Sequence, residues 1–157
     1  MSSAKTPKLF LAGEVTDEMT FKVIPFLQEN RRRKVEIFIN SEGGSVQQAL
    51  QIYQLIKNHG KVTTIAVAEC SSAATLILAG ANERLAMFET DFLIHHGSEG
   101  SNSRKETWNN ETKYIRMVEI YNSIGIPDDM LKLFMNYEET LTTAAALKYK
   151  LITGVYT

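Results

Sequence analysis

The chain has 157 residues, of which 44% are hydrophobic and 22% charged, as is ordinary for one soluble globular domain with a sizeable core. The formal net charge of −1 gives no electrostatic reason to expect a nucleic-acid or membrane-surface partner. No apolar run approaches the roughly 18 residues of a membrane span, and the first residues lack a secretory signal, so we expect a cytoplasmic protein. A single cysteine, Cys70, excludes an intrachain disulfide and a CxxC metal site.

Strand and helix patterns alternate after a short polar tail at residues 1–7, with no linker that would divide the chain into two domains. The predicted strands are residues 8–12, 35–40, 62–67, 83–87, 91–95 and 152–156. The predicted helices are residues 17–30, 45–59, 73–79, 105–123, 127–136 and 142–150, and the small polar stretch 97–103 is a predicted connection. Because strand–helix–strand repeats favour right-handed crossovers, the pattern predicts an α/β fold with a mostly parallel sheet.

Several helix ends carry typical boundary residues. Thr16 is a predicted N-cap for the first helix, Ser45 opens the second, and Gly60 ends it. Thr142 or Thr143 is expected to cap the last helix.

Two basic features are predicted to be solvated rather than functional. The run RRRK at residues 31–34 lies between a helix and a strand, which favours a solvated connection over a nucleic-acid site. His59 lies at a helix end beside Gly60, where we expect an exposed side chain.

The longest predicted helix, residues 105–123, changes character along its length. Its first half is polar all round apart from Trp108. Its second half has an apolar seam formed by Tyr114, Met117, Tyr121 and Ile124. A helix that is polar at one end and seamed at the other is expected to project from the domain and meet a partner chain.

The candidate site is the turn between the strand at 62–67 and the helix at 73–79. Ser72 at this strand-to-helix turn would expose its Oγ beside free helix N–H groups, as a nucleophile requires, although Ser71 or Ser72 could equally be a helix cap. The Gly43-Gly44 turn and His95 also follow predicted strands. In parallel sheets, functional sites lie beyond the carboxyl ends of the strands, so these residues are expected to meet.

A hydrolytic serine needs a base, a group that orients the base, and donors for the oxyanion. The chain order would be Ser72, His95 and then an acid near Glu138. This order differs from those of the α/β-hydrolases, chymotrypsin and subtilisin.

Four segments in this order resemble the Clp protease proteolytic subunit family, of the ClpP/crotonase fold. They are INSEGGSVQQALQIYQLI, VTTIAVAECSSAATLILAG, DFLIHH and EETLTTAAALKYKLI. The resemblance covers nearly the whole chain from Lys8 onward and suggests a short, phage-type member. It implies repeated β-β-α units, a mostly parallel sheet and a projecting handle helix.

By position, the resemblance implies that Ser72 is the nucleophile, His95 the general base and Glu138 the acid, with Glu139 as the fallback. The family more often has Asp at the acid position. The implied oxyanion donors are the backbone N–H groups of Gly44 and Ala73. No metal or cofactor is expected.

The chain departs from the family pattern at several points. Glu42 replaces the proline of the glycine turn, Ala68 replaces a glycine, and Ala73-Ala74 stands for Met-Gly. Only seven residues precede the first predicted strand, so most of the segment that helps to dock the ATPase ring is expected to be missing. The span between histidine and acid is also shortened, which predicts a trimmed handle.

The resemblance predicts a serine endopeptidase that cleaves peptides or unfolded polypeptides inside a homo-oligomeric ring. It implies a heptameric ring, which in the family is stacked in pairs, and an AAA+ unfoldase as candidate partner. A crotonase-type acyl-CoA enzyme is an alternative that would need no Ser–His pair. An inactive ring subunit is a second alternative, which the change from Asp to Glu leaves open.

Overall fold

This computed structural model describes residues 4–95 and 104–157, and the side chains of all of these except residues 104–110. The connection predicted at 97–103 and the side chain of Trp108 therefore lie outside the described residues. The strands are β1 (Lys8–Ala12), β2 (Val35–Ser41), β3 (Val62–Ser71), β4 (Glu83–Ala86), β5 (Asp91–Leu93) and β6 (Gly154–Val155). The helices are α1 (Asp17–Glu29), α2 (Val46–His59), α3 (Ala73–Leu78), α4 (Arg104–Ser123), α5 (Asp128–Tyr137) and α6 (Thr143–Lys148).

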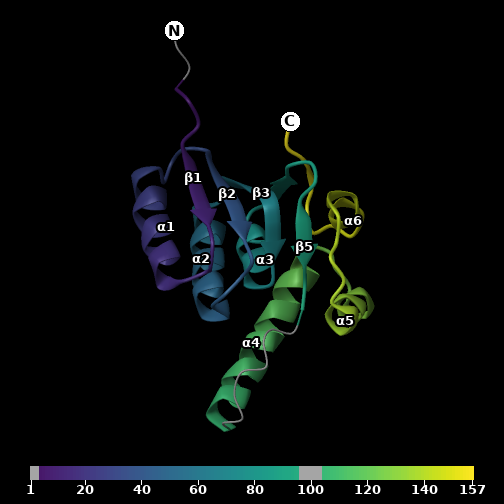
Figure 1. Cartoon of the computed structure of the whole chain (residues 1–157). Coiled ribbons are helices and arrows are strands. Elements are labelled where there is room, and N and C mark those ends of the chain that lie inside the picture. The colour runs from purple at the N-terminus through teal and green to yellow at the C-terminus, as the bar shows by residue number, and fades with distance from the viewer. Residues whose placement is uncertain (1–3, 96–103) are drawn as a thin grey trace.

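The strands form one sheet in the order β1-β2-β3-β4-β6, with β5 beside the end of β3. Every pairing between these strands is parallel. In Figure 1 the helices α1, α2 and α3 lie behind the sheet, and α4 projects beyond the carboxyl ends of the strands. The predicted α/β fold, with its mostly parallel sheet and projecting helix, is confirmed.

The core lies between the central strands and the helices behind them. All six residues of α3 are buried, because this helix is apolar apart from Thr75 and is enclosed by the sheet, α2 and α4. Burial of side chains such as Leu76, Ile77 and Leu78 contributes about 1.5–3 kcal/mol each relative to exposure. The amino end of α3, where the serine turn lies, is thus attached to one of the most firmly packed elements of the chain.

β3 is longer than predicted because it bends and changes partner. Its first part pairs with β4, and residues 69–71 pair with β5 instead. Ala68 lies between the two parts in a left-handed conformation, with φ 62°, and the register against β2 shifts between Ile39 and Ser41. The bend lets the strand continue to Ser71, where sequence periodicity suggested an end at Val67.

The predicted boundary residues are confirmed, although one of them makes no side-chain hydrogen bond. The Ser45 side chain accepts a hydrogen bond from the Gln48 N–H, and Gly60 ends α2 with φ 78°. Thr142, rather than Thr143, accepts from the Ala145 N–H at the start of α6. Thr16 is the N-cap residue of α1, as predicted, but its side chain makes no capping hydrogen bond.

His59 is not the solvated residue that the sequence suggested. Its Nε2 lies 2.9 Å from the carbonyl oxygen of Asn30, and its Nδ1 accepts a hydrogen bond from the Lys61 N–H. The imidazole is half-buried and links the end of α1 to the α2–β3 connection. The role of His59 is therefore structural.

The predicted seam on α4 is confirmed. Met117 and Tyr121 are buried, while Tyr114 and Ile124 are half-buried and pack against the core. The strands predicted at 91–95 and 152–156 are shorter than expected, ending at Leu93 and covering only Gly154–Val155. Each of these strands pairs with only one other strand, and the apolar residues next to it, such as Ile94 and Ile152, lie outside the regular strand.

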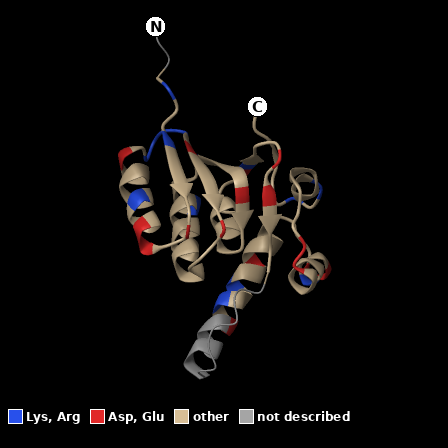
Figure 2. Cartoon of the chain, in the orientation of Figure 1, with Lys and Arg blue, Asp and Glu red and all other residues tan. Residues whose placement is uncertain are grey.

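The basic run lies far from the carboxyl ends of the strands. Figure 2 shows lysine and arginine residues gathered at the opposite, amino-terminal edge of the sheet, where the connection from α1 enters β2. Within this connection, Arg33 donates a hydrogen bond to the carbonyl of Lys5. None of the described helices has the length and apolar character needed to cross a membrane.

Candidate active site

Ser72 occupies the single residue between the end of β3 and the start of α3. Its backbone has φ 56° and ψ −127°, a conformation that costs a non-glycine residue about 1–3 kcal/mol. Ser72 is the N-cap residue of α3 by position, but its side chain makes no capping hydrogen bond, so its hydroxyl does not stabilise the helix end. The residue is partly exposed, and its Oγ has no hydrogen-bond partner among the described residues.

The glycine turn after β2 packs directly on the serine turn. A Cβ added to Gly43 would lie 2.8 Å from the Ser72 Cβ and 2.9 Å from the Ser71 carbonyl oxygen. A Cβ added to Gly44 would lie 2.6 Å from the carbonyl oxygen of Val15. Both glycines also have positive φ, so the packing of Gly43 on the serine turn and of Gly44 on the connection after β1 requires residues without a side chain.

Two backbone N–H groups at this junction remain without an acceptor among the described residues. The Gly43 N–H donates to the Ser41 Oγ and the Ser45 N–H donates to the Val15 carbonyl, but the Gly44 N–H between them is not used. The N–H of Ala73, the first residue of α3, also has no acceptor there. These are the two groups named from the resemblance as oxyanion donors. Ala73 directly follows Ser72, and Gly44 follows Gly43, the residue of the glycine turn that packs on Ser72.

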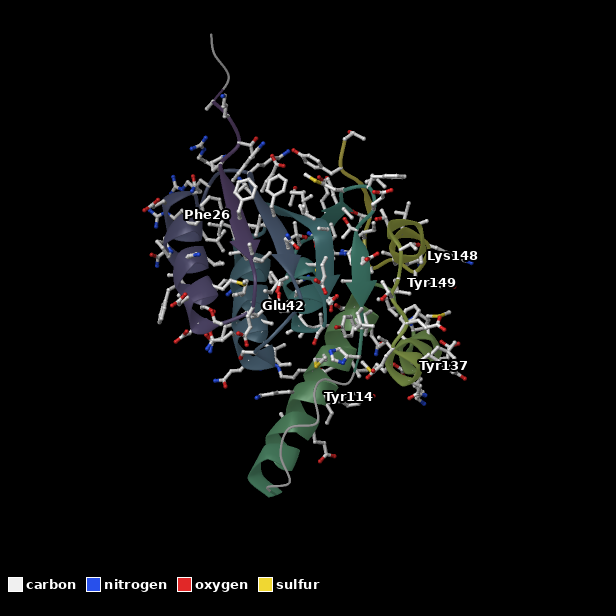
Figure 3. The ribbon with its side chains drawn as sticks, viewed as in Figure 1. Phe26, Glu42, Tyr114, Tyr137, Lys148 and Tyr149 are labelled. Atoms are coloured by element: carbon white, nitrogen blue, oxygen red, sulfur yellow. The ribbon has the colours of Figure 1, made fainter. Side chains whose placement is uncertain are left out.

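Glu42 stands where the family pattern has proline, and its side chain is exposed. Figure 3 shows Glu42 on the turn that follows β2, at the edge of the sheet from which α4 projects. An exposed carboxylate at this point avoids the free-energy cost of burying a charge. The substitution is therefore compatible with the fold of the turn.

His95 lies two residues beyond β5, at the same edge of the sheet as Ser72. The two strands run in register there, with Ser71 opposite Leu93, and the Ser72 N–H donates to the Leu93 carbonyl at 2.7 Å. The His95 side chain is 21% exposed.

Glu138 is the carboxylate that the structure brings to His95. Its Oε1 lies 3.8 Å from the His95 Nδ1, an ion-pair separation that is longer than a hydrogen bond. The Glu138 side chain is 58% exposed, and its backbone, with φ 47°, ends α5. The described residues contain no such contact between His95 and the fallback acid, Glu139.

Cys70, two residues before Ser72, is fully buried. Burial raises the pKa of its thiol well above the usual range, and the nearby charge of Glu69 raises it further. The thiolate is the reactive form of cysteine, so this side chain is unreactive near neutral pH. Among the described residues, no group of three His, Cys, Asp or Glu side chains could hold a metal ion.

Sequence reasoning missed one contact directly behind the serine turn. The Thr75 Oγ1 donates to the Ser72 carbonyl at 2.7 Å and lies 2.6 Å from the hydroxyl of Tyr121 on α4. The sequence signal was a threonine in an otherwise apolar helix, but its partner is 46 residues away and is not indicated by any local pattern.

Solved structures share this arrangement of sheet and helices. ClpP1 from Listeria monocytogenes superposes with a TM-score of 0.82 at 22% identity, over 95% of this chain and 90% of that one. The ClpP protease catalytic domain from Plasmodium falciparum superposes with a TM-score of 0.78 at 19% identity, over 96% and 85%. The fold is therefore that of ClpP.

Sequence comparison then gives the family. The family model for Clp protease matches residues 2–157, and the chain belongs to the Clp protease family. It is 31% identical over 162 residues to the ATP-dependent Clp protease proteolytic subunit 1 of Borreliella burgdorferi, covering 94% of this chain and 82% of that protein. It is 30% identical over 157 residues to an ATP-dependent Clp protease proteolytic subunit of Pleurastrum terricola, covering 92% and 80%.

Proposed function

We propose that the chain is a serine endopeptidase subunit in which Ser72 is the nucleophile. The observation that carries the proposal is the Ser72 turn itself. A strained backbone holds a hydroxyl that has no described partner, directly before Ala73 and against the glycine turn, and the N–H groups of Ala73 and Gly44 have no described acceptor. Strain of this kind concentrates at functional sites, and a serine hydroxyl that makes no capping hydrogen bond, in a turn with two unused N–H donors, is suited to acyl transfer.

In this mechanism the Ser72 Oγ attacks the carbonyl carbon of the scissile peptide bond while His95 accepts the hydroxyl proton. The negative charge that develops on the carbonyl oxygen is stabilised by the N–H groups of Gly44 and Ala73. The protonated His95 then gives its proton to the leaving amine. Water, deprotonated by His95, releases the acid product from Ser72 and restores the hydroxyl.

Glu138 has the role of orienting His95 and stabilising the imidazolium that forms. The separation of 3.8 Å must shorten by about 1 Å to give a hydrogen bond. An exposed glutamate side chain can make this movement, and catalytic hydrogen bonds are often long before substrate binds. The additional methylene of Glu over Asp supplies the reach.

The substrate class and assembly follow from the family rather than from the site. We propose that peptides and unfolded polypeptides are cleaved inside a homo-oligomeric ring, because one chain of this size cannot enclose a chamber. The resemblance implies that the ring has seven subunits. The relatives are named ATP-dependent, which supports an AAA+ unfoldase as the partner.

A serine-directed fluorophosphonate probe tests the nucleophile. The wild-type protein should be labelled once per chain, and Ser72→Ala should abolish labelling and peptide hydrolysis without changing the fold. Ser71→Ala is the matched control, because Ser71 is the preceding hydroxyl on the same turn but is buried. Absence of labelling in the wild type would favour an acyl-CoA enzyme or an inactive subunit, and loss of labelling in Ser71→Ala alone would move the nucleophile by one residue.

A further inference from the structure

Two hydroxyl groups form a buried chain behind Ser72. The Thr75 Oγ1 lies 2.7 Å from the Ser72 carbonyl oxygen and 2.6 Å from the Tyr121 hydroxyl oxygen. Thr75 and Tyr121 are both completely buried. The contact connects α3, which begins directly after Ser72, with α4, and Thr75 and Tyr121 lie 46 residues apart in the sequence.

The direction of this hydrogen-bond chain follows from the number of protons. A threonine hydroxyl has one proton, and the Ser72 carbonyl can only accept, so the Thr75 proton is directed to Ser72. Tyr121 must then donate its own proton to the Thr75 Oγ1. Burial raises the pKa of Tyr121 well above the usual range, so its hydroxyl keeps this proton. Each donor in such a chain strengthens the next.

The peptide groups on both sides of Ser72 are held by hydrogen bonds. On one side, the Ser72 N–H donates to the Leu93 carbonyl of β5 at 2.7 Å. On the other, the Ser72 carbonyl accepts from the Thr75 N–H at 3.0 Å as well as from the Thr75 hydroxyl. The strained backbone of Ser72 is thus held at its N–H by β5 and at its carbonyl by a chain of donors that ends on α4.

We infer that Thr75 and Tyr121 are positioning residues for the nucleophile, which fix the Ser72 carbonyl through the chain Tyr121 O–H to Thr75 O–H to Ser72 C=O. The inference rests on the proposed role of Ser72. A residue in a strained conformation keeps it only when its surroundings determine it, and here the surroundings are these two hydroxyls together with the Leu93 carbonyl. These hydrogen bonds couple the position of α4 to the direction of the Ser72 Oγ.

If Thr75 had only a structural role, replacing another buried threonine near α3 would have the same effect on catalysis as replacing Thr75. Thr64 provides this comparison, because its Oγ1 donates to the Leu78 carbonyl at 2.8 Å and it is as fully buried as Thr75. The Thr64 bond holds the carboxyl end of α3, whereas the Thr75 bond holds the residue before its amino end. The two side chains are equally buried and each donates to a backbone carbonyl, but only Thr75 bonds to Ser72 and contacts a second hydroxyl, that of Tyr121.

The experiment compares Thr75→Val, Thr75→Ser, Tyr121→Phe and the control Thr64→Val in the full-length chain. Peptide hydrolysis gives kcat and KM, and the rate of fluorophosphonate labelling reports the nucleophile directly. Thr75→Val should lower kcat and the labelling rate about 10- to 100-fold with KM unchanged, since small displacements of reacting atoms have effects of this size. Thr75→Ser, which retains the hydroxyl, should restore most of both rates.

Tyr121→Phe keeps the ring and removes only the terminal donor, so it should produce a smaller loss of kcat in the same direction. The double variant of Tyr121→Phe and Thr75→Val should lose no more kcat than Thr75→Val alone, because Thr75→Val already removes both side-chain hydrogen bonds. Thr64→Val should also lower the midpoint of thermal unfolding but leave kcat within about twofold, because its hydrogen bond holds the other end of α3.

Equal kcat losses in Thr64→Val and Thr75→Val would overturn the inference, as would an unaffected kcat in both Thr75→Val and Tyr121→Phe. If Thr75→Val fails to fold, the kcat of Tyr121→Phe and of Thr75→Ser decides. Failure of the proposed function itself is distinguishable, because the wild-type protein would then not react with the fluorophosphonate at all.

Discussion

Phe92 and Leu141 exchange two backbone hydrogen bonds, from the Phe92 N–H to the Leu141 carbonyl at 2.9 Å and back at 2.7 Å. This antiparallel bridge attaches the segment after α5 to β5, three residues from Glu138 on one side and three from His95 on the other. It is the contact that brings the carboxylate and the imidazole together across 43 residues of chain (138 − 95 = 43).

We expect Glu138→Gln to lower kcat by about 10²–10⁴-fold with little change in KM, since the carboxylate that stabilises the imidazolium is lost while the shape is kept. Steady-state peptide hydrolysis measures both constants. Glu139→Gln is the matched control and should retain turnover, because no contact between Glu139 and His95 is present among the described residues. The reverse pattern, with turnover lost only in Glu139→Gln, would assign the acid to Glu139.

Gly43→Ala should abolish fluorophosphonate labelling. Its Cβ would lie 2.8 Å from the Ser72 Cβ and 2.9 Å from the Ser71 carbonyl, so the serine turn must shift. The control is Gly13→Ala, because Gly13 also has positive φ but has open space around its missing Cβ. Gly13→Ala should reduce stability by about 1–2 kcal/mol and leave labelling intact. Undiminished labelling in Gly43→Ala would show that the two turns do not pack as described.

Ala68→Gly should be neutral or should stabilise the protein by up to about 1 kcal/mol, although glycine usually destabilises a strand. The reason is that Ala68 has φ 62°, which glycine adopts without a steric penalty. Ala66→Gly, in the regular part of β3, should instead destabilise by about 1 kcal/mol or more. Urea unfolding measures both changes. A clear loss of stability in Ala68→Gly would contradict the strained bend.

The element order and the buried helix stripes could be predicted because they follow from periodicity, which is local. The bend of β3 could not, since an alanine in the left-handed region gives no local signal and only the glycine of the family pattern hinted at it. His95 and Glu138 were likewise paired through the resemblance and not through their spacing. The Thr75–Tyr121 contact was missed because it depends on how α4 packs against α3.

Stability should fall as the pH rises above about 8.5–9. Burial raises the pKa of Cys70 and of Tyr121 above their usual values, about 8.5 and 10, and the charge of Glu69 adds to the shift at Cys70. A group with a raised folded-state pKa contributes stability that is fully present below its unfolded-state pKa and is lost as the pH rises toward the folded-state value. Urea unfolding between pH 7 and pH 10.5 checks this.

Cys70→Ala is the control for this pH dependence, because it removes the thiol and leaves Tyr121. The variant should show a shallower decline between about pH 8.5 and 10, since each ionising group contributes at most about 1.4 kcal/mol per pH unit. A thiol reagent at pH 8 should modify Cys70 slowly in the native wild type and rapidly in the urea-unfolded chain, at one site per chain. A stability that stays level to pH 10.5 would disprove the expectation.

Ring stacking should be weak and sensitive to salt, whereas the ring itself should form readily. The family resemblance implies that rings stack in pairs through the projecting helix, here α4. The first half of α4 is rich in polar and charged residues: Lys105, Glu106, Asn109, Asn110, Glu111 and Lys113. Among the described side chains of α4, the only exposed large apolar one is Ile115. Exposed ion pairs contribute about 0–1 kcal/mol each and are screened by salt. Sedimentation velocity across a salt series should therefore show a double ring dissociating to single rings. A double ring that persists into high salt would refute the prediction, and so would a monomer at every concentration.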